Sequence, residues 1–436
     1  MRIAIKTLGC KVNQYDSAVI RERLGSEPCT FVPFEEKAEV YVLNTCTVTD
    51  KADWEARQLV RRAKRLAPDA RVVVTGCYAQ VNPKEVSQLS GVDFVVGLNR
   101  MDELVACVRG AGSVESSPAL VGDPREERGV PVLGAKKFDG HTRAFLKIQE
   151  GCNFACSYCI IPTARGRSRS VIPAEVLAQV RSLAGAGFVE VVLTGIHLGG
   201  YGHDLRPRTN LSELIRNISE NGLIRRLRLS SLDPREVSDE LLGTIVETKV
   251  LCPHLHVCVQ AGDDALLKAM RRNYDTAYFE ETLTQARKLL PNAALGTDLI
   301  VGFPGESDAS FQRSLDFLAR LPLTYFHVFP YSTRAGTPAT NMPDHIPTEI
   351  KKERARLARA LGAEKKQAFY RSAIGDQVTV LVERVSQKEA GFVRGYSENY
   401  MPVMLPGSTE LINHEVSVGI GRWAGGRLWG TPVEGH

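Results

Sequence analysis

The stretch FLKIQEGCNFACSYCIIP, residues 145–162, governs the interpretation of the whole chain. It opens with a strand-like run, after which Cys152, Cys156 and Cys159 follow in a CxxxCxxC spacing. Three thiolates on one loop at the end of a strand can converge on a single soft metal centre. A cubane iron–sulfur cluster normally has four cysteine ligands, so three would leave one iron open for substrate chemistry. The alternatives are a zinc site that lacks its fourth ligand, or unrelated core cysteines.

Strand-like and helical runs alternate on both sides of this loop. Between residues 138 and 368 the strand-like runs are FLKIQ, VEVVLTG, LRLSSL, LHVCVQ, ALGTDLIVGF and FHVFPY. Helical stretches of adequate length separate each pair of runs. Six βα units predict a curved parallel sheet, a partial (β/α)6 barrel that makes up about three-quarters of a complete (β/α)8 barrel.

The flanking regions have different patterns. Residues 1–112 alternate helical periodicity, as in Asp53–Leu66, with short β-branched runs, which predicts a parallel sheet covered by helices. These runs are Ile3–Leu8, Val40–Asn44, Val72–Thr75 and Phe94–Val96. Residues 113–137 are rich in Gly, Ser, Pro and Glu and are expected to form a linker. Residues 369–434 contain short strands with Gly and Pro turns, which predicts a small all-β barrel. The fold class is therefore α/β with an all-β C-terminal domain.

A second set of cysteines is dispersed in the sequence but occupies equivalent positions. Cys10, Cys46 and Cys77 each follow a predicted strand of the N-terminal domain, in TLGC, LNTC and VTGC. In an open parallel sheet, ligands bind beyond the carboxyl ends of the strands, so the three thiols can meet at one point. Cysteine is also a common buried residue, which is the simpler explanation for any one of them.

Composition excludes some classes of protein. No apolar run approaches the roughly 20 residues that span a bilayer, and the N-terminus has no signal-peptide pattern, so we expect a cytoplasmic protein without a membrane partner. The ten cysteines favour metal or redox chemistry in that compartment. The net charge is +5, and residues 351–371 hold eight Lys or Arg against two Glu. That segment is either a solvated helix face or a surface that contacts phosphates.

The CxxxCxxC loop after the first strand of a partial barrel resembles radical S-adenosylmethionine (SAM) enzymes. The resemblance implies that Cys152, Cys156 and Cys159 bind a [4Fe-4S] cluster that cleaves SAM to a 5′-deoxyadenosyl radical. Segments after later strands resemble the SAM pocket of that family: VVLTGIHLGG, RLSSLDP, VQAG and DLIVGFPGE. They supply the candidate SAM contacts Gly195, Ser230, Ser231, Gln260 and Gly302.

With the second cysteine set, the chain is similar to the methylthiotransferases within that superfamily. The resemblance implies a flavodoxin-like N-terminal domain, a radical SAM core and a C-terminal TRAM barrel. It assigns Cys10, Cys46 and Cys77 to a second [4Fe-4S] cluster that carries sulfur to the substrate. It also implies the anticodon stem-loop of tRNA and an electron donor such as flavodoxin or ferredoxin as partners. We expect a monomer.

The motif TLGCKVNQYDS resembles the MtaB branch, which methylthiolates N6-threonylcarbamoyladenosine at position 37 of tRNA. The branch that acts on isopentenyladenosine 37 usually has GCQMN here, and the branch that acts on an aspartate of ribosomal protein uS12 usually has GCPKN. Both remain alternatives, and a zinc-stabilised RNA-binding module is a remote one.

Other residues carry lesser expectations. Arg165, Arg167 and Arg169 are candidates for phosphate contacts. The tail from residue 372 holds seven acidic and five basic residues, so it is not basic. Its aromatic residues either fill the small core or stack on bases: Phe392, Tyr396, Tyr400, Trp423 and Trp429. We expect satisfied core histidines at His197, His256 and His327, and core or free thiols at Cys29, Cys107, Cys252 and Cys258.

Overall fold

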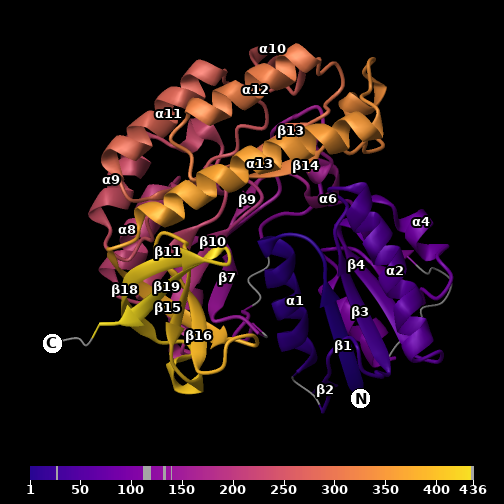
Figure 1. Cartoon of the computed structure of the whole chain (residues 1–436). Coiled ribbons are helices and arrows are strands. Elements are labelled where there is room, and N and C mark those ends of the chain that lie inside the picture. The colour runs from indigo at the N-terminus through magenta and orange to yellow at the C-terminus, as the bar shows by residue number, and fades with distance from the viewer. Residues whose placement is uncertain (26–27, 111–118, 131–133, 139, 434–436) are drawn as a thin grey trace.

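The computed structural model describes residues 1–25, 28–110, 119–130, 134–138 and 140–433 (Figure 1). Parts of the expected linker at 113–118 and 131–133, and the last residue of the expected C-terminal domain, 434, lie outside this range. The described chain forms the three parts that the sequence predicts: a parallel α/β sheet, a partial barrel and a small β-barrel.

The N-terminal part is a six-stranded parallel sheet in the order β2-β1-β3-β4-β5-β6. Its strands are β1 (Arg2–Thr7), β2 (Thr30–Phe31), β3 (Val40–Thr45), β4 (Arg71–Gly76), β5 (Phe94–Val96) and β6 (Ala119–Leu120). Its helices are α1 (Lys11–Leu24), α2 (Asp50–Leu66), α3 (Cys77–Val81), α4 (Pro83–Ser87) and α5 (Met101–Arg109). Every residue of β3 is buried, because helices cover both faces of the sheet. Helix α1 lies between this sheet and the central part (Figure 1).

The central part holds six parallel strands in the order β7-β10-β11-β12-β13-β14. Two isolated parallel bridges, Leu227–Leu251 and Leu232–Val257, join its two three-stranded halves. The strands are β7 (Arg143–Lys147), β10 (Glu190–Thr194), β11 (Arg226–Leu229), β12 (His254–His256), β13 (Ala294–Val301) and β14 (Tyr325–Pro330). The partial (β/α)6 barrel is thus confirmed.

Helices surround these strands on the outside (Figure 1). They are α6 (Ile161–Arg165), α7 (Pro173–Gly185), α8 (Leu211–Glu220), α9 (Asp239–Glu247), α10 (Asp264–Ala269), α11 (Thr276–Leu289), α12 (Asp308–Arg320) and α13 (Thr348–Ser372), with short helices η1 (Leu198–Gly200), η2 (Pro234–Glu236) and η3 (Pro338–Asn341). A short hairpin pairs β8 (Gln149–Glu150) with β9 (Arg169–Ser170). Alternate strand residues pack against the helices, so the largest hydrophobic core lies between the sheet and the helical layer.

The C-terminal part is a closed five-stranded barrel in the order β15-β16-β17-β19-β18. Its elements are β15 (Gln377–Val385), β16 (Phe392–Ser397), β17 (Pro402–Pro406), η4 (Thr409–Leu411), β18 (Glu415–Ala424) and β19 (Arg427–Pro432). Helix α13 connects it to the central part and crosses β14 on the way (Figure 1). The expected boundary at residue 368 therefore falls within the last turns of α13.

The five aromatic residues of the tail do not make up the core of the C-terminal barrel. That core is mainly aliphatic, with Val380, Val382, Val403 and Leu428 among its members. Of the five aromatics, Trp423 packs on the edge of this core. Tyr396 and Tyr400 instead stack on each other and face arginines of the central part.

Two of the three arginines expected at phosphates are buried. Only 1% of the Arg165 side chain is exposed, and Arg169 is buried as well. Arg165 forms ion pairs with Asp16 and Glu150, because a buried guanidinium requires carboxylate partners. Arg167 alone is exposed. The expectation for Arg165 and Arg169 was therefore wrong.

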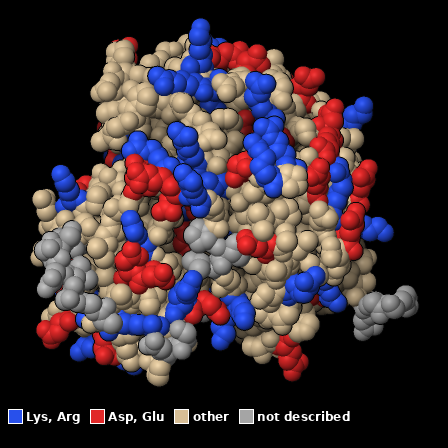
Figure 2. Space-filling model, turned by 180° about the vertical axis from the view of Figure 1, so that it is seen from behind, with Lys and Arg blue, Asp and Glu red and all other residues tan. Residues whose placement is uncertain are grey.

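Some charged side chains of the basic helix α13 are buried and others are exposed. Arg354 is buried and bonds with Glu306 and Asp308. Lys352, Arg356 and Lys366 are exposed, so part of the helix remains available to a polyanion. On the opposite face of the molecule, acidic and basic side chains are interspersed, with Lys and Arg more frequent across the upper half (Figure 2). Within the described residues, no helix has both the length and the apolar character needed to cross a membrane.

Candidate metal and cofactor site

The first cysteine triplet lies on the loop between β8 and α6. Gly151 precedes it with φ of +72°, and a Cβ atom there would lie 2.0 Å from the carbonyl oxygen of Arg167. The loop is held by backbone hydrogen bonds from Cys152 to Gly166 and from Cys159 to Cys156. Burial, together with the neighbouring thiols, raises the pKa of Cys152 to about 11 and that of Cys159 to about 12. The structure thus gathers all three thiols in one partly buried place.

Arg272, in the segment that follows α10, supports this loop. Its guanidinium donates to Sγ of Cys156 at 3.0 Å and to the hydroxyl of Tyr274 at 3.0 Å. A further hydrogen bond joins it to the carboxylate of Asp233. A cation beside a sulfur ligand stabilises the thiolate form, which is the form that binds metal. Sequence reasoning missed Arg272, because it lies 116 residues from Cys156 and no motif marks it.

The second triplet assembles at the carboxyl edge of the N-terminal sheet, as the sequence predicts. Cys10 follows β1, Cys46 follows β3, and Cys77 begins α3 after β4. Burial raises the pKa of Cys46 to about 12, and the thiols of Cys77 and Cys10 contribute to the same direction. Burial also raises the pKa of Cys77, with Cys10 again among the causes. Each thiol is therefore within electrostatic reach of the other two.

A glycine brings the third thiol into this position. Gly76 has φ of +94°, and a Cβ atom there would lie 2.3 Å from the carbonyl oxygen of Thr45. Only glycine permits this close approach of the loops after β3 and β4. The motifs LNTC and VTGC therefore place Cys46 and Cys77 through backbone contacts.

One cavity of about 220 Å³ is bounded by both cysteine loops. Cys159 and its neighbours line one side, and Val48 and Thr49, just after Cys46, line another. Gln260 contributes a polar group from the segment after β12, and Asp298 contributes one from β13. A ligand in this cavity would lie beside Cys159 of the first triplet and beside the loop that carries Cys46.

The five expected SAM contacts differ in their surroundings. Gln260 lines the cavity and has φ of +71°, an uncommon conformation for a residue with a side chain. Ser230 is buried at the end of β11, and its hydroxyl has no hydrogen-bond partner among the residues that the structure describes. Ser231 is exposed. Gly195 and Gly302 are covered by the side chains of other residues, Gln149 and Lys351 respectively. The unpartnered hydroxyl of Ser230 and the free amide of Gln260 fit a polar cofactor.

His256 of β12 and His327 of β14 flank Asp298 of β13, which lines the cavity. Asp298 lies 3.2 Å from Nε2 of His256 and accepts a hydrogen bond from His327 at 3.1 Å. Burial opposes ionisation of Asp298, but the two histidines outweigh it and lower the pKa of the carboxyl. His256 is buried as expected, whereas His197, which packs on Phe154, has a side chain that is 15% exposed. Nε2 of each ring has no hydrogen-bond partner among the described residues, so the expectation that both are satisfied was wrong. The side chain of His327 is 58% exposed, so the expectation of a core histidine was wrong there.

The spacing of potential ligands indicates where a single metal ion could bind. Zn–S bonds of about 2.3 Å place sulfur ligands of one tetrahedral zinc roughly 3.8 Å apart. Within the described residues, the one group of three potential ligands whose atoms all lie within 4.8 Å is His256, Asp298 and His327. All ten cysteines are free of disulfides, including Cys29, Cys107, Cys252 and Cys258.

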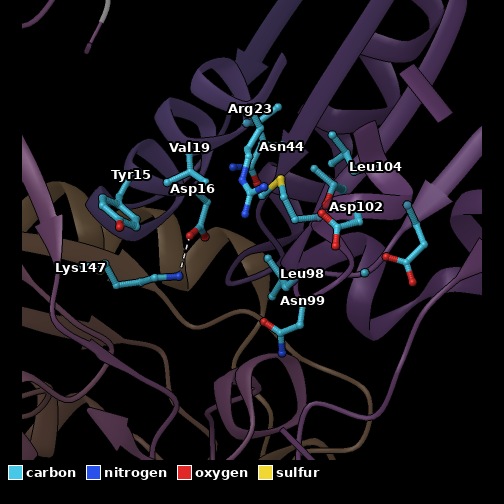
Figure 3. A pocket seen from close by; sticks show the side chains of 15 residues that line it. Tyr15, Asp16, Val19, Arg23, Asn44, Leu98, Asn99, Asp102, Leu104 and Lys147 are labelled. Carbon is cyan, nitrogen blue, oxygen red and sulfur yellow. Dashed lines mark hydrogen bonds and ion pairs between the residues drawn. The ribbon is translucent and has the colours of Figure 1, made fainter. Parts of the chain in front are cut away.

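A buried network of charges joins the two cysteine-bearing parts. Lys147 of β7 points toward α1, where Asp16 accepts its hydrogen bond at 2.7 Å (Figure 3). Glu150 bonds with Lys147 at 2.6 Å and with Arg165 at 2.8 Å. Arg165 also counteracts burial at Cys77 by favouring its thiolate. A second cavity, of about 190 Å³, lies beside this network between α1 and α5 (Figure 3).

Comparisons with known proteins agree with this architecture. Residues 2–97 match a family described as "Uncharacterized protein family UPF0004", and residues 146–318 match the Radical SAM superfamily. The solved structure of TsrM, a radical SAM methyltransferase from Kitasatospora setae, shares the fold with a TM-score of 0.55 and 18% identity over 78% of this chain and 77% of that chain. The superfamily match implies SAM and a [4Fe-4S] cluster as cofactors.

Two relatives match nearly the whole chain. The threonylcarbamoyladenosine tRNA methylthiotransferase MtaB of Bacillus subtilis is 37% identical over 96% of this chain and 93% of its own length. The tRNA-2-methylthio-N(6)-dimethylallyladenosine synthase of Moorella thermoacetica is 34% identical over 99% of this chain and 98% of its own length. The chain therefore belongs to the tRNA methylthiotransferase family of radical SAM enzymes.

Proposed function

We propose that this chain transfers a methylthio group to C2 of N6-threonylcarbamoyladenosine at position 37 of tRNA. The observation that carries the proposal is the cavity bounded by both cysteine loops. A base in that cavity would lie beside Cys159 and beside the loop that carries Cys46, and radical formation and sulfur delivery to one carbon require a position near both cysteine sets. The MtaB relative, which is named for this substrate, supports the choice of nucleoside.

We assign Cys152, Cys156 and Cys159 to the SAM-binding [4Fe-4S] cluster, and Cys10, Cys46 and Cys77 to a second one. When bound, these groups supply a carbon radical able to remove hydrogen from an aromatic C–H, and a sulfur for that carbon. The C2 hydrogen is not acidic, so we assign no protein residue as a general acid or base. Gly195, Ser230, Ser231, Gln260 and Gly302 remain the proposed SAM contacts.

The chain's own side chains orient and tune these groups. Arg272 links Cys156 to the buried carboxylate of Asp233 and so fixes one face of the first loop. Arg165 holds a buried positive charge near Cys77. Cations near sulfur ligands stabilise the added negative charge of a cluster. The apolar residues Ile160, Ile300 and Phe329 narrow the cavity and limit water inside it.

Each part of the chain has a separate role in this proposal. Residues 1–112 would carry the second cluster, residues 138–368 the first cluster and SAM, and residues 369–434 would assist RNA binding as a TRAM domain. The exposed lysines and arginines of α13 would contact the phosphates of the anticodon stem-loop. The protein would act in the cytoplasm as a monomer, with a flavodoxin or ferredoxin as electron donor.

Dimethylallyladenosine 37 is the second candidate substrate, since the Moorella relative named for it is 34% identical over 99% of the chain. Mass spectrometry of digested tRNA from a deletion strain separates the two. We expect loss of the methylthio mark from threonylcarbamoyladenosine alone, with recovery when the wild-type gene returns. Loss from dimethylallyladenosine, or from the aspartate of uS12 with tRNA unchanged, would contradict the proposal.

A further inference from the structure

The lumen of the partial barrel contains a group of polar side chains that the cluster chemistry does not use. Arg143 begins β7, Arg228 lies in β11, and His254 begins β12. Tyr400 enters from the turn between β16 and β17 of the C-terminal barrel, and Lys11 enters from the start of α1, next to Cys10. Three separate parts of the chain thus contribute to one place.

Tyr400 lies at the centre of this group. The guanidinium carbon of Arg143 is 5.2 Å from its ring centroid, and that of Arg228 is 4.8 Å away. Tyr396 stacks beneath it with centroids 5.0 Å apart. The backbone of Tyr400 has φ of +67°, which is strained for a bulky residue and is retained only where the surroundings hold it.

The cations of this group are unequally compensated. Arg228 forms two bonds with Glu190, at 2.6 and 3.2 Å, and Arg143 donates from Nε to Glu383 at 2.7 Å. Lys11 lies within electrostatic reach of both arginines and Tyr400. No residue in the described part of the chain forms an ion pair or hydrogen bond with its ammonium group. An anion beside Lys11 would relieve the repulsion among the three cations.

His254 supplies an independent sign that a ligand is missing. The residue is 4% exposed, and its Nε2 bonds with the hydroxyl of Tyr325 at 2.7 Å. Its Nδ1 is buried, and no described residue forms a hydrogen bond with it. Its ring centroid lies 5.0 Å from that of Tyr400. Buried polar atoms are almost always paired, so an unpaired one in this position indicates a polar group that arrives with a ligand.

Side chains of the same barrel wall connect this group with the cavity that Cys159 and Asp298 line. The ring of Tyr325 lies 6.1 Å from His254 and 5.9 Å from His256. Nε2 of His256 in turn lies 3.2 Å from the carboxylate of Asp298, which lines the cavity. A nucleoside with its base in the cavity could therefore extend a polar substituent along this wall.

We propose that Lys11, Arg143, His254 and Tyr400, here named the lumen site, bind the threonyl group of the modified nucleoside. This inference rests on the proposed function, and it adds the contacts by which the protein selects its substrate. Threonine joined through its nitrogen keeps a free carboxylate and a hydroxyl. The carboxylate pairs with Lys11, Arg143 and the hydroxyl of Tyr400, and the threonyl hydroxyl pairs with Nδ1 of His254. A dimethylallyl substituent offers no group to any of them.

The test compares two anticodon stem-loops, one with threonylcarbamoyladenosine 37 and one with its methyl ester, which removes only the negative charge. Dissociation constants are measured with the cluster-loaded protein and its variants Lys11→Gln, Lys11→Arg and Tyr400→Phe. Lys37→Gln is the matched control, because Lys37 is exposed on the loop before β3, at the opposite end of that sheet. Methylthiolation of the acid stem-loop by the wild-type protein is measured in parallel.

We expect the wild-type protein to prefer the acid over the ester by about 10-fold to 100-fold, the range of a charge-assisted hydrogen bond. Lys11→Gln should abolish that preference while leaving ester binding unchanged, and Lys11→Arg should retain most of it. Tyr400→Phe should reduce it several-fold. Lys37→Gln should behave as wild type.

Because Lys11 adjoins Cys10, iron content is measured for each variant. If Lys11→Gln loses iron, Tyr400→Phe, from a different part of the chain, decides the matter alone. A preference for the acid that survives in iron-loaded Lys11→Gln, or that is undiminished in Tyr400→Phe where that variant decides, would overturn the lumen site. Wild-type methylthiolation would then leave the proposed function standing, whereas its absence on both stem-loops would refute the proposed function itself.

Discussion

Cys156 and Cys46 hold corresponding places in the two triplets, yet their replacement should have different consequences. We expect Cys156→Ala to abolish SAM cleavage, because a cluster with two protein ligands cannot be retained in the form that binds SAM. Cys46→Ala should leave SAM cleavage measurable but prevent sulfur insertion. Cleavage is followed by release of 5′-deoxyadenosine, and insertion by mass spectrometry of the product nucleoside.

The matched control is Cys107→Ala, which removes a buried thiol of α5 that belongs to neither triplet. Both activities should persist in this variant. Full methylthiolation by either Cys156→Ala or Cys46→Ala would disprove the role assigned to that cysteine.

At the scale of the element, the loop between β8 and α6 depends on the conformation of Gly151. A side chain at Gly151 would meet the carbonyl of Arg167, and the positive φ disfavours it further. We expect Gly151→Ala to lower the free energy of unfolding by about 1–3 kcal/mol and to reduce iron bound by the first triplet. Chemical denaturation and iron analysis measure the two effects.

Gly129→Ala is the control that separates the cost of backbone strain from the cost of the contact with Arg167. Gly129 has a similar φ of +77°, and no described atom lies within 4 Å of the added Cβ. This substitution should cost about 1 kcal/mol and leave iron content unchanged. Equal effects of the two substitutions would show that the contact with Arg167 is unimportant.

At the scale of the whole molecule, buried ion pairs join the three parts. Arg226 of β11 is buried and bonds across to the C-terminal barrel, with Glu415 at 2.6 Å and with the carbonyl of Thr379 at 2.7 Å. Removal of Glu415 leaves the buried guanidinium with the more distant carboxylate of Glu190, 3.8 Å away, so Glu415→Ala should lower the free energy of unfolding by about 3 kcal/mol. Glu410→Ala, at an exposed position of η4, should change it by less than about 0.5 kcal/mol. Similar unfolding midpoints for the two variants would contradict this account.

The network around Glu150 predicts a dependence on pH. Burial opposes the charge of Glu150, but Arg165 and Lys147 outweigh it and lower its pKa from 4.5 to about 2. A carboxyl whose pKa is lower in the folded state stabilises the protein above pH 4.5 and loses that contribution as pH falls toward 2. The stability difference between wild type and Glu150→Gln should therefore be full near neutral pH and shrink below pH 4.5. A difference that stays constant from pH 6 to pH 3 in denaturation experiments would show that another group is responsible.

The sequence alone determined the order of the elements and the local geometry of the site. Alternating strand and helix runs predicted the parallel sheet, the six-stranded partial barrel and the small β-barrel, all confirmed. The CxxxCxxC spacing located the first triplet, and cysteines after successive strands located the second. Such features are readable because periodicity, strand ends and turn glycines depend on residues close together in the chain.

Only the tertiary structure decided which charged side chains are buried and which distant ones meet. Arg165 looked like a phosphate contact beside two other arginines, but it is buried against Asp16, 149 residues away. Lys11, Arg143, His254 and Tyr400 come from three parts of the chain, and no spacing in the sequence connects them. Burial and pairing of a charge depend on the domains packed around it, and that packing is fixed by contacts between residues far apart in sequence.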